Sequence, residues 1–308
     1  MVSHVSRQDH FRAEQIGAFI HLLSGHGEVV SIYDEAINIL HPNKLIVSLV
    51  ENHAHMTALS IRLPTLFRHL EATADDVQPG SKALFDGGRL IINGLYIGLD
   101  GAQTFDGMIG PDDIRGFRLA KVPLIRDALT RKGKRGGLLG LIHSEEKENP
   151  FVQKASGLLT QVLTKGQGTS AMKGLSQLVG LGIGFTPSGD DFISGVLLAE
   201  KILNLLSSHE ITVPEIGEQR ITPWAIDKEA IWNVREKTTH GGRTLPWQAL
   251  QAHFPYYLIE AARGLAYATT ADEITNVVGR AVSHGETSGT DALVGLLFYM
   301  NSVVVFRG

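Results

Sequence analysis

The sequence predicts an α+β protein in which a β-rich N-terminal part is followed by an α-helical C-terminal part. The first part contains short runs of β-branched and alternating apolar residues between turn signals, a pattern typical of half-buried strands. From about Leu119 onward the apolar residues recur at helical spacing instead. This change predicts a β-rich domain over residues 1–118 and a helical domain over residues 119–308.

The first part is expected to open with an amphipathic helix near residues 9–24 and to continue as strands. Turn signals such as His41-Pro-Asn43 and Asp86-Gly-Gly88 separate the strand-like runs. Short strands joined by turns favour a small antiparallel sheet or a partial barrel. The predicted strands are 29–33, 45–50, 57–63 and 90–99.

The second part is expected to consist of helices with two polar interruptions, 144–150 and 207–223, which have the composition of surface segments. The final apolar run, 303–306, has a strand-like composition. The predicted helices are 119–132, 151–165, 170–180, 189–206, 226–239, 257–267, 271–282 and 289–300.

Composition restricts the classes of function. The 308 residues are 43% hydrophobic and 19% charged, as in an ordinary globular protein. A net charge of −4 argues against binding to nucleic acid or an acidic membrane, and no apolar run is long enough for a membrane span. The absence of cysteine excludes disulfides and thiolate catalysis, which fits a cytoplasmic protein. An anionic ligand would therefore be held locally, by backbone amides or a few cations.

The strongest functional signal is a glycine-rich loop that leads into a helix, Gly180-Leu-Gly-Ile-Gly-Phe-Thr-Pro-Ser-Gly-Asp-Asp191. The loop is not a phosphate-binding P-loop, because no lysine follows its last glycine, and it is neither a dinucleotide fingerprint nor a nucleophile elbow. Ser188 is therefore expected to cap the helix or to contact a ligand, with the N-terminal end of the helix favouring an anion. The loop residues expected to bind ligand are Gly184, Thr186, Ser188 and Gly189.

The helix start recurs 100 residues later, where Ser288-Gly-Thr-Asp291 matches Ser188-Gly-Asp-Asp191. Each copy has the Ser-x-x-Asp arrangement of a capping box and a glycine four residues after its last aspartate, which permits close helix packing. Two such helices can place their N-terminal ends together around one ligand, although a purely structural duplication is the alternative. The further residues expected to bind ligand are Asp191, Ser288, Gly289 and Asp291.

Asp190 is predicted to be catalytic, because the capping arrangement does not explain it. Its carboxylate can accept hydrogen bonds from a carbamoyl or amide NH₂, accept a proton, or hold Mg²⁺ next to phosphate. A plain, solvated helix start is the alternative.

Further candidates lie in the segment from Thr238 to Thr244, where His240 and Arg243 are expected to bind ligand. Arginine supplies the cation that a carboxylate or phosphate needs, whereas a helix C-terminus stabilised by both side chains is the alternative. The segment His284-Gly-Glu286 can line the same pocket. His53 and His55 share a face if their segment is extended, but no third ligand is apparent and no metal site is predicted.

The block Gly-Phe-Thr-Pro-Ser-Gly-Asp-Asp-Phe at residues 184–192, with Ser-Gly-x-Asp-x-Leu-x-Gly at 288–295, resembles the AllH-type oxamate carbamoyltransferase subunit family. The resemblance implies a cytoplasmic subunit of a multi-protein enzyme in purine (allantoin) catabolism. That enzyme moves a carbamoyl group between oxalurate and phosphate and yields oxamate and carbamoyl phosphate. Small anionic substrates and other protein subunits are the implied partners. Separately from the resemblance, no cofactor is predicted, and the carboxylate of Asp190 leaves Mg²⁺ as a possibility.

Other functions remain open beside this resemblance. One is a non-catalytic binding or scaffold subunit whose glycine-rich loop packs against a partner. Another is a metal-dependent hydrolase or phosphotransferase that uses Asp190 and Asp191. If the chain is the carbamoyltransferase subunit, the helix N-termini with Arg243 or Arg235 hold the charge of the substrate and stabilise the tetrahedral intermediate.

Overall fold

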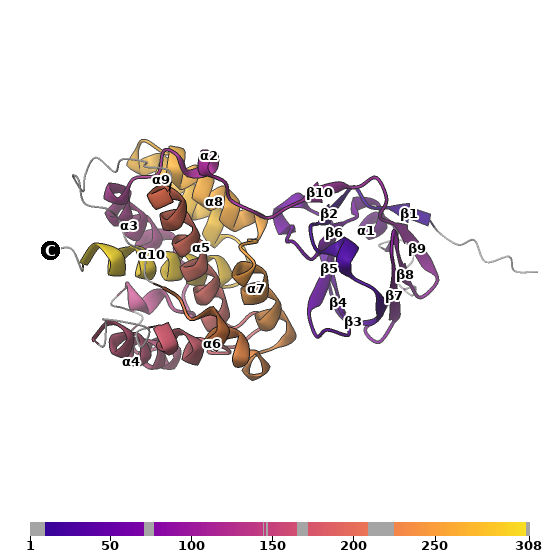
Figure 1. Ribbon diagram of the computed structural model, residues 1–308, viewed down its shortest axis with the longest axis horizontal. Helices are drawn as coiled ribbons and strands as arrows, with labels where there is room; N and C mark the ends of the chain where they lie inside the picture. Colours follow the sequence, from indigo (N-terminus) through magenta and orange to yellow (C-terminus); the bar gives the residue numbers. More distant parts are fainter. Residues whose placement is uncertain are drawn as a thin grey trace, which may run out of the picture. The chain divides into compact units, whose positions relative to one another are not determined.

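A computed structural model describes residues 10–70, 77–143, 145, 147–164, 172–208 and 225–305. The fold is α+β, as predicted, with strands in the first part of the chain and helices in the second (Figure 1). Contacts within the chain divide it into two compact units, Met1–Gly107 and Met108–Gly308. The short helix α2 (Pro111–Ile114) packs against a helix of the second unit. The domain boundary between residues 118 and 119 stays a prediction.

The described residues of the first unit form one sheet of ten strands in the order β1-β9-β8-β7-β3-β4-β5-β6-β2-β10. Most neighbouring pairs are antiparallel, as expected for strands joined by short turns. The strands are β1 (His10–Arg12), β2 (Gln15–Gly17), β3 (Gly25–Tyr33), β4 (Ala36–Leu40), β5 (Ile46–Val50), β6 (Ser60–Arg62), β7 (Lys82–Asp86), β8 (Arg89–Ile92), β9 (Leu95–Gly98) and β10 (Gln103–Phe105).

The sheet curls into a partly closed barrel because one short segment, residues 10–17, supplies β1 at one end of the strand order and β2 next to the other end. Its first half, β1, pairs in parallel with β9. Its second half, β2, pairs with β6 and β10. The prediction of a sheet or partial barrel is therefore confirmed.

The helix predicted near residues 9–24 is wrong. That segment contains β1, β2 and a 3₁₀ turn at Ile20–Leu22. Its buried apolar residues follow a spacing of three or four, which imitates an amphipathic helix, although strand pairing and the turn produce it. These residues are Ala13, Ile16, Ile20 and Leu23.

The run predicted as one strand over 90–99 is a hairpin. Asn93 and Gly94 both adopt positive φ angles, 47° and 91°, between β8 and β9. Two consecutive positive φ angles are the requirement of the tight hairpin turn that Asn-Gly favours.

The interior of the barrel is made of aliphatic side chains such as Ile37 and Leu49, which face each other on β4 and β5 and are fully buried.

The second unit consists of helices around a central pair, α5 and α10 (Figure 1). Nearly every residue of α5 as far as Ala199 is buried, so this helix has no solvent-facing side over most of its length. The helices after α2 are α3 (Val122–Lys132), α4 (Pro150–Thr164), α5 (Ser188–Ser208), α6 (Lys228–Asn233), α7 (His240–Leu250), α8 (Tyr256–Tyr267), α9 (Ala271–Val282) and α10 (Ser288–Val305). A further helix, α1 (Pro64–Leu70), belongs to the first unit.

Several predicted helices of this unit need correction. The one expected at 170–180 is a 3₁₀ helix where it is described, Met172–Leu178. The one expected at 226–239 is divided into α6 and a 3₁₀ turn. Residues 303–305 continue α10 and do not form a strand. Most of the expected surface excursion at 207–223, and residues 144 and 146 of the other polar segment, lie outside the described residues.

The central helices cross where the sequence places their matching glycines. A Cβ atom added to Gly195 would overlap the carbonyl oxygen of Ala292, and one added to Gly295 would overlap that of Phe192. The two contacts are equivalent under the offset of 100 residues. The sequence repeat therefore corresponds to a local twofold arrangement that brings both helix starts together.

In the parts of the chain that the structure describes, none of the helices has both the length and the apolar character needed to cross a membrane.

Candidate functional site

The N-terminal ends of α5 and α10 meet. The hydroxyl of Thr186, just before α5, lies 3.0 Å from the hydroxyl of Ser288, the first residue of α10. Asp191 and Asp291 interact by charge across the same junction. The structure therefore brings together side chains that lie 100 residues apart in the sequence.

The capping boxes expected at the two helix starts are not formed. Each helix begins one residue earlier than such a box requires, because the amide of Asp191 donates to the carbonyl of Pro187 and that of Asp291 to the carbonyl of Thr287. Neither carboxylate accepts a hydrogen bond from the serine amide that a capping box would use. Both carboxylates are consequently available for contacts outside their own helix turn.

The Asp191 carboxylate is fully buried, and neither of its oxygens has a hydrogen-bond partner among the described residues. Burial raises the pKa of this carboxyl well above its usual value, and the charge of Asp291 raises it further. The hydroxyls of Ser288 and Thr186 oppose this rise in pKa without making a hydrogen bond of normal geometry. Burial and the neighbouring carboxylate therefore favour the protonated form of Asp191 relative to an exposed carboxyl.

The Asp291 carboxylate is also buried, but one of its oxygens is bonded. Oδ1 accepts a hydrogen bond of 2.6 Å from the amide of Leu138, and Oδ2 has no described partner. Gly137 lies so close that any side chain there would overlap the carboxylate. Burial raises the pKa of Asp291 to about 6, opposed by the Leu138 amide and then by the hydroxyls of Ser188 and Thr287, which make no hydrogen bond of normal geometry to Oδ2.

Tyr257 of α8 supplies the third polar group of this cluster. Its ring is stacked on His284 at a centroid distance of 3.9 Å, and its buried hydroxyl has no described hydrogen-bond partner. Burial and the charges of Asp191 and Asp291 raise the pKa of the phenol, so it stays protonated. We call Asp191, Asp291 and Tyr257 the carboxylate–tyrosine cluster.

Sequence reasoning missed Tyr257 and the loop that ends in Leu138. The loop carries a signal, since a Gly-Gly pair follows two cations in Gly133-Lys-Arg-Gly-Gly137. A tyrosine in an apolar helical run carries none.

Asp190 has different contacts from Asp191. Its Oδ2 accepts a hydrogen bond of 2.6 Å from the hydroxyl of Thr238, and both oxygens lie 3.3 Å from the amide of Gly180. Burial raises the pKa of Asp190 to about 7, and these two donors oppose the rise. Asp190 thereby joins the glycine-rich loop to the segment that leads into α7.

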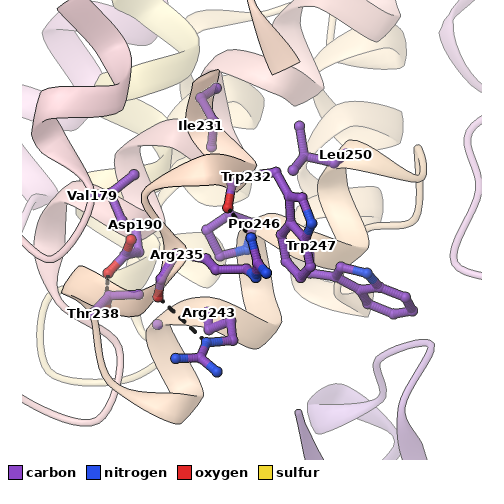
Figure 2. A pocket seen from close by; sticks show the side chains of 11 residues that line it. Val179, Asp190, Ile231, Trp232, Arg235, Thr238, Arg243, Pro246, Trp247 and Leu250 are labelled. Carbon is purple, nitrogen blue, oxygen red and sulfur yellow. Dashed lines mark hydrogen bonds between the residues drawn. The ribbon is translucent and has the colours of Figure 1, made fainter. Parts of the chain in front are cut away.

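The same carboxylate borders a small recess, shown in Figure 2. Arg235 lies over the ring of Trp232, with its guanidinium carbon 4.3 Å from the ring centroid. The enclosed volume is about 10 Å³, about the size of one water position. The lining residues are Val179, Asp190, Ile231, Trp232, Arg235, Thr238, Gly242, Arg243, Pro246, Trp247 and Leu250.

The segment from Thr238 to Thr244 begins a helix, so its interpretation as a helix C-terminus is wrong. Thr239 is the N-cap of α7, and its hydroxyl accepts from the amide of Gly242. Arg243 is buried and donates to Glu236 at 2.8 Å. His240 is the first residue of α7, and its Nδ1 is buried without a described partner.

The glycines at the two helix starts have a packing function. A Cβ atom on Gly189 would overlap the carbonyl of Leu178, and one on Gly289 would overlap that of Ala281. Their amides donate to backbone carbonyls of the protein at 2.7 and 3.2 Å. Gly184, in contrast, is exposed in the loop, with a φ of 100°. The amides of Gly189 and Gly289 are therefore already used within the chain.

The two histidines considered as metal ligands have separate partners. His53 lies 2.6 Å from Gln15, and His55 lies 2.8 Å from Glu35. The part of the chain that the structure describes has no group of three or more histidine, aspartate or glutamate side chains that fits a metal ion.

The carboxylate–tyrosine cluster has defined chemical properties. It offers three buried carboxylate oxygens and one phenol hydroxyl that the described protein leaves without partners. Two negative charges close together are unfavourable at a buried site, so the pair Asp191 and Asp291 tends to keep one proton. A ligand with N–H donors, or a proton in transit, satisfies these oxygens.

Comparison with protein families gives two matches on this chain. A family model described as oxamate carbamoyltransferase subunit AllH matches residues 178–300, which contain both helix starts. A second model, the AllH family N-terminal domain, matches residues 10–104, which contain the barrel. Comparisons with curated proteins and with solved structures gave no significant match. The family matches together cover most of the chain, which therefore belongs to the AllH family of oxamate carbamoyltransferase subunits.

Proposed function

We propose that this chain forms the pocket of a multi-subunit carbamoyltransferase in which the carbamoyl-bearing substrate is bound, at the starts of α5 and α10. The observation that carries the proposal is the pair Asp191 and Asp291, whose three buried oxygens have no described partner. Each buried polar atom left without a partner costs about 1–3 kcal/mol. Proteins retain such costs chiefly where a ligand or a reaction uses the group.

The proposed reaction is the exchange between oxalurate plus phosphate and oxamate plus carbamoyl phosphate. A phosphate oxygen attacks the carbamoyl carbon of oxalurate, and the bond from that carbon to the oxamate nitrogen breaks. The leaving nitrogen takes a proton, so that oxamate leaves with an NH₂ group. A buried carboxyl whose pKa is raised toward neutrality, such as Asp291, is suited to give and regain that proton.

Asp190 has two alternative roles in this proposal, catalysis and positioning of the glycine-rich loop. Its catalytic role stays a prediction, while its bonds with Thr238 and Gly180 support a positioning role for the glycine-rich loop. The other ligand-binding residues predicted from the loop, and a cytoplasmic location in purine catabolism, form part of the same proposal.

Thermal denaturation of the purified chain tests the proposal. Oxamate, carbamoyl phosphate and phosphate are added singly, each with and without Mg²⁺. A ligand at 100 times its Kd adds about 2.7 kcal/mol of stability, so Tm should rise by several degrees. Asp191→Asn and Asp291→Asn should each abolish the rise, whereas Asp112→Asn, on an exposed side chain, should keep it.

Carbamoyl transfer by the enzyme reconstituted with its partner subunits gives the second measurement. Asp191→Asn should lower kcat at least tenfold. Full transfer by this variant would refute the proposal and favour a scaffold subunit. A rise in Tm that requires Mg²⁺ with phosphate, and that persists in Asp191→Asn, would favour a metal-dependent reaction at another place.

A further inference from the structure

We infer that the carboxylate–tyrosine cluster binds the neutral primary amide end of the substrate, and that the phosphate or carboxylate end lies outside the cluster. In this arrangement Asp191 and Asp291 accept the two N–H bonds of a –CO–NH₂ group. The hydroxyl of Tyr257 donates to its carbonyl oxygen. The inference rests on the proposed function and specifies which part of the substrate this chain recognises.

The first argument is the pattern of unused donors and acceptors. The cluster contains unpartnered oxygens on two carboxyl groups and one unpartnered phenol hydroxyl. A primary amide offers two N–H donors and one carbonyl acceptor. The two patterns are complementary, whereas an ionised phosphate or carboxylate offers acceptors only and leaves the carboxylate oxygens of the cluster without donors.

The second argument is charge. An anion placed next to Asp191 and Asp291 needs a cation to offset repulsion in a buried place. The cations of the adjoining loop are engaged elsewhere, since Lys134 donates to the carbonyls of Ser283 and Gly285 and Arg135 pairs with Glu145. A neutral amide adds no charge to the cluster and avoids this cost.

The third argument is preorganisation. The ring of Tyr257 is nearly parallel to that of His284, with an interplanar angle of 13°. The Leu138 amide fixes one oxygen of Asp291, and the other oxygen stays without a described partner. Groups held in this way recognise a ligand at low entropic cost.

Oxamate and oxalate form a matched pair of ligands for the test, because oxalate has a carboxylate oxygen where oxamate has NH₂. Their affinities are measured by calorimetry with the full chain at pH 7.5, and as inhibition constants with the reconstituted enzyme. Oxamate should bind at least 100-fold more tightly than oxalate, since a site that requires a donor rejects a ligand that lacks it. Inorganic phosphate should not compete with oxamate.

Substitution of Tyr257 isolates the phenol. Tyr257→Phe should weaken oxamate binding about tenfold, the effect of one lost hydrogen bond, and should leave the weak binding of oxalate unchanged. Tyr267→Phe, at the exposed end of the same helix, is the control and should have wild-type affinity. Circular dichroism confirms that both variants are folded.

The outcomes separate this inference from the proposed function. Equal affinities for oxamate and oxalate, or competition by phosphate, would overturn the inference, while sensitivity of either ligand to Asp191→Asn would still support the proposed function. Equal loss of both ligands in Tyr257→Phe would also overturn it. No binding of any of these ligands, by the chain or by the reconstituted enzyme, would reject both.

Discussion

The starts of α5 and α10 have the same backbone arrangement but use their polar side chains differently. At position 190 an aspartate accepts hydrogen bonds from Thr238 and Gly180, and at the equivalent position Thr290 accepts one from the amide of Lys134. At the next position both helices have an aspartate, and these two carboxylates interact across the junction.

The two polar positions at each helix start therefore have different roles. The outer position, 190 or 290, ties each helix start to a neighbouring loop, and a charge is not required for that purpose because Thr290 does it with a hydroxyl. The inner position, 191 or 291, faces the other helix and keeps oxygens without described partners. An aspartate with such oxygens at this position in both copies of the repeat is what the proposed ligand site requires.

The largest expected effect comes from breaking the crossing that makes the two starts meet. Gly195→Ala or Gly295→Ala places a methyl group onto a backbone carbonyl that cannot move without shifting a helix. We expect each to lower the free energy of unfolding by about 3 kcal/mol or more. Denaturant unfolding measures this loss.

A glycine elsewhere in the same unit provides the control. Gly157, in α4, has no atom within 4 Å of an added Cβ. Gly157→Ala should therefore stabilise the protein by up to about 1 kcal/mol, through helix propensity alone. A wild-type stability for either Gly195→Ala or Gly295→Ala would show that the helices do not cross as closely as described.

This crossing was predictable from sequence because it depends on a local spacing repeated twice. The pairing of Asp190 with Thr238 was not, since the two residues are separated by 48 positions and no spacing in the sequence relates their two segments. The same holds for Asp291 and Leu138, separated by 153 positions. Spacing within a helix shows which residues share a face, whereas tertiary packing decides what that face meets.

The sequence interpretation therefore identified the correct region and the pairing of its two helices, but attributed capping to the two aspartates that do not cap. In the first unit, alternation and turn signals predicted the β-rich fold. The predicted helix near residues 9–24 failed because burial at a spacing of three or four also arises from short strands followed by a turn. Periodicity over so few residues does not distinguish these cases.

The next largest effect is expected at the inner position of α5, where the free energy of unfolding should depend on pH through Asp191. Because the folded-state pKa of Asp191 is raised above its unfolded value, near 3.8, its stabilising preference for the proton is complete below that value and is lost as pH rises toward the folded pKa. Asn carries no such charge. Asp191→Asn should therefore be more stable than the wild type at pH 8, by about 2 kcal/mol.

The difference between Asp191→Asn and the wild type should shrink as pH falls toward 4, where both side chains are neutral. Unfolding by denaturant at pH 4, 6 and 8 checks this trend. A stability gain together with lost ligand binding is typical of a functional residue. A variant less stable than the wild type at pH 8 would contradict the assignment of Asp191 to the ligand site.

A smaller effect is expected at the outer position of α5. Thr238→Val removes the donor that opposes the raised pKa of Asp190, so this pKa should move above 7. Below about pH 6 the carboxyl is neutral in both proteins, and the loss should be about 1 kcal/mol. At pH 8 the wild-type bond is made to a charged group, and the loss should reach about 1.5 kcal/mol.

Thr238→Ser retains the hydroxyl and should retain most of the stability. A loss in Thr238→Val that is the same at every pH would show that the ionised form of Asp190 does not depend on this bond. If Asp190→Asn loses carbamoyl transfer while it remains folded, and Thr238→Val does not, the predicted catalytic role of Asp190 gains support over a positioning role.

The smallest effect should be found at the outer position of α10, where no charge is involved. Thr290→Val removes the acceptor for the Lys134 amide, a bond of 2.9 Å, at a fully buried site. We expect a loss of about 1 kcal/mol that is the same at pH 5.5 and pH 8, because neither partner titrates. Thr290→Ser is the matched control, and denaturant unfolding at the two pH values is the measurement. A pH-dependent loss would mean that the Lys134 loop is coupled to Asp291, so that the outer and inner positions of α10 do not act separately as they do in α5.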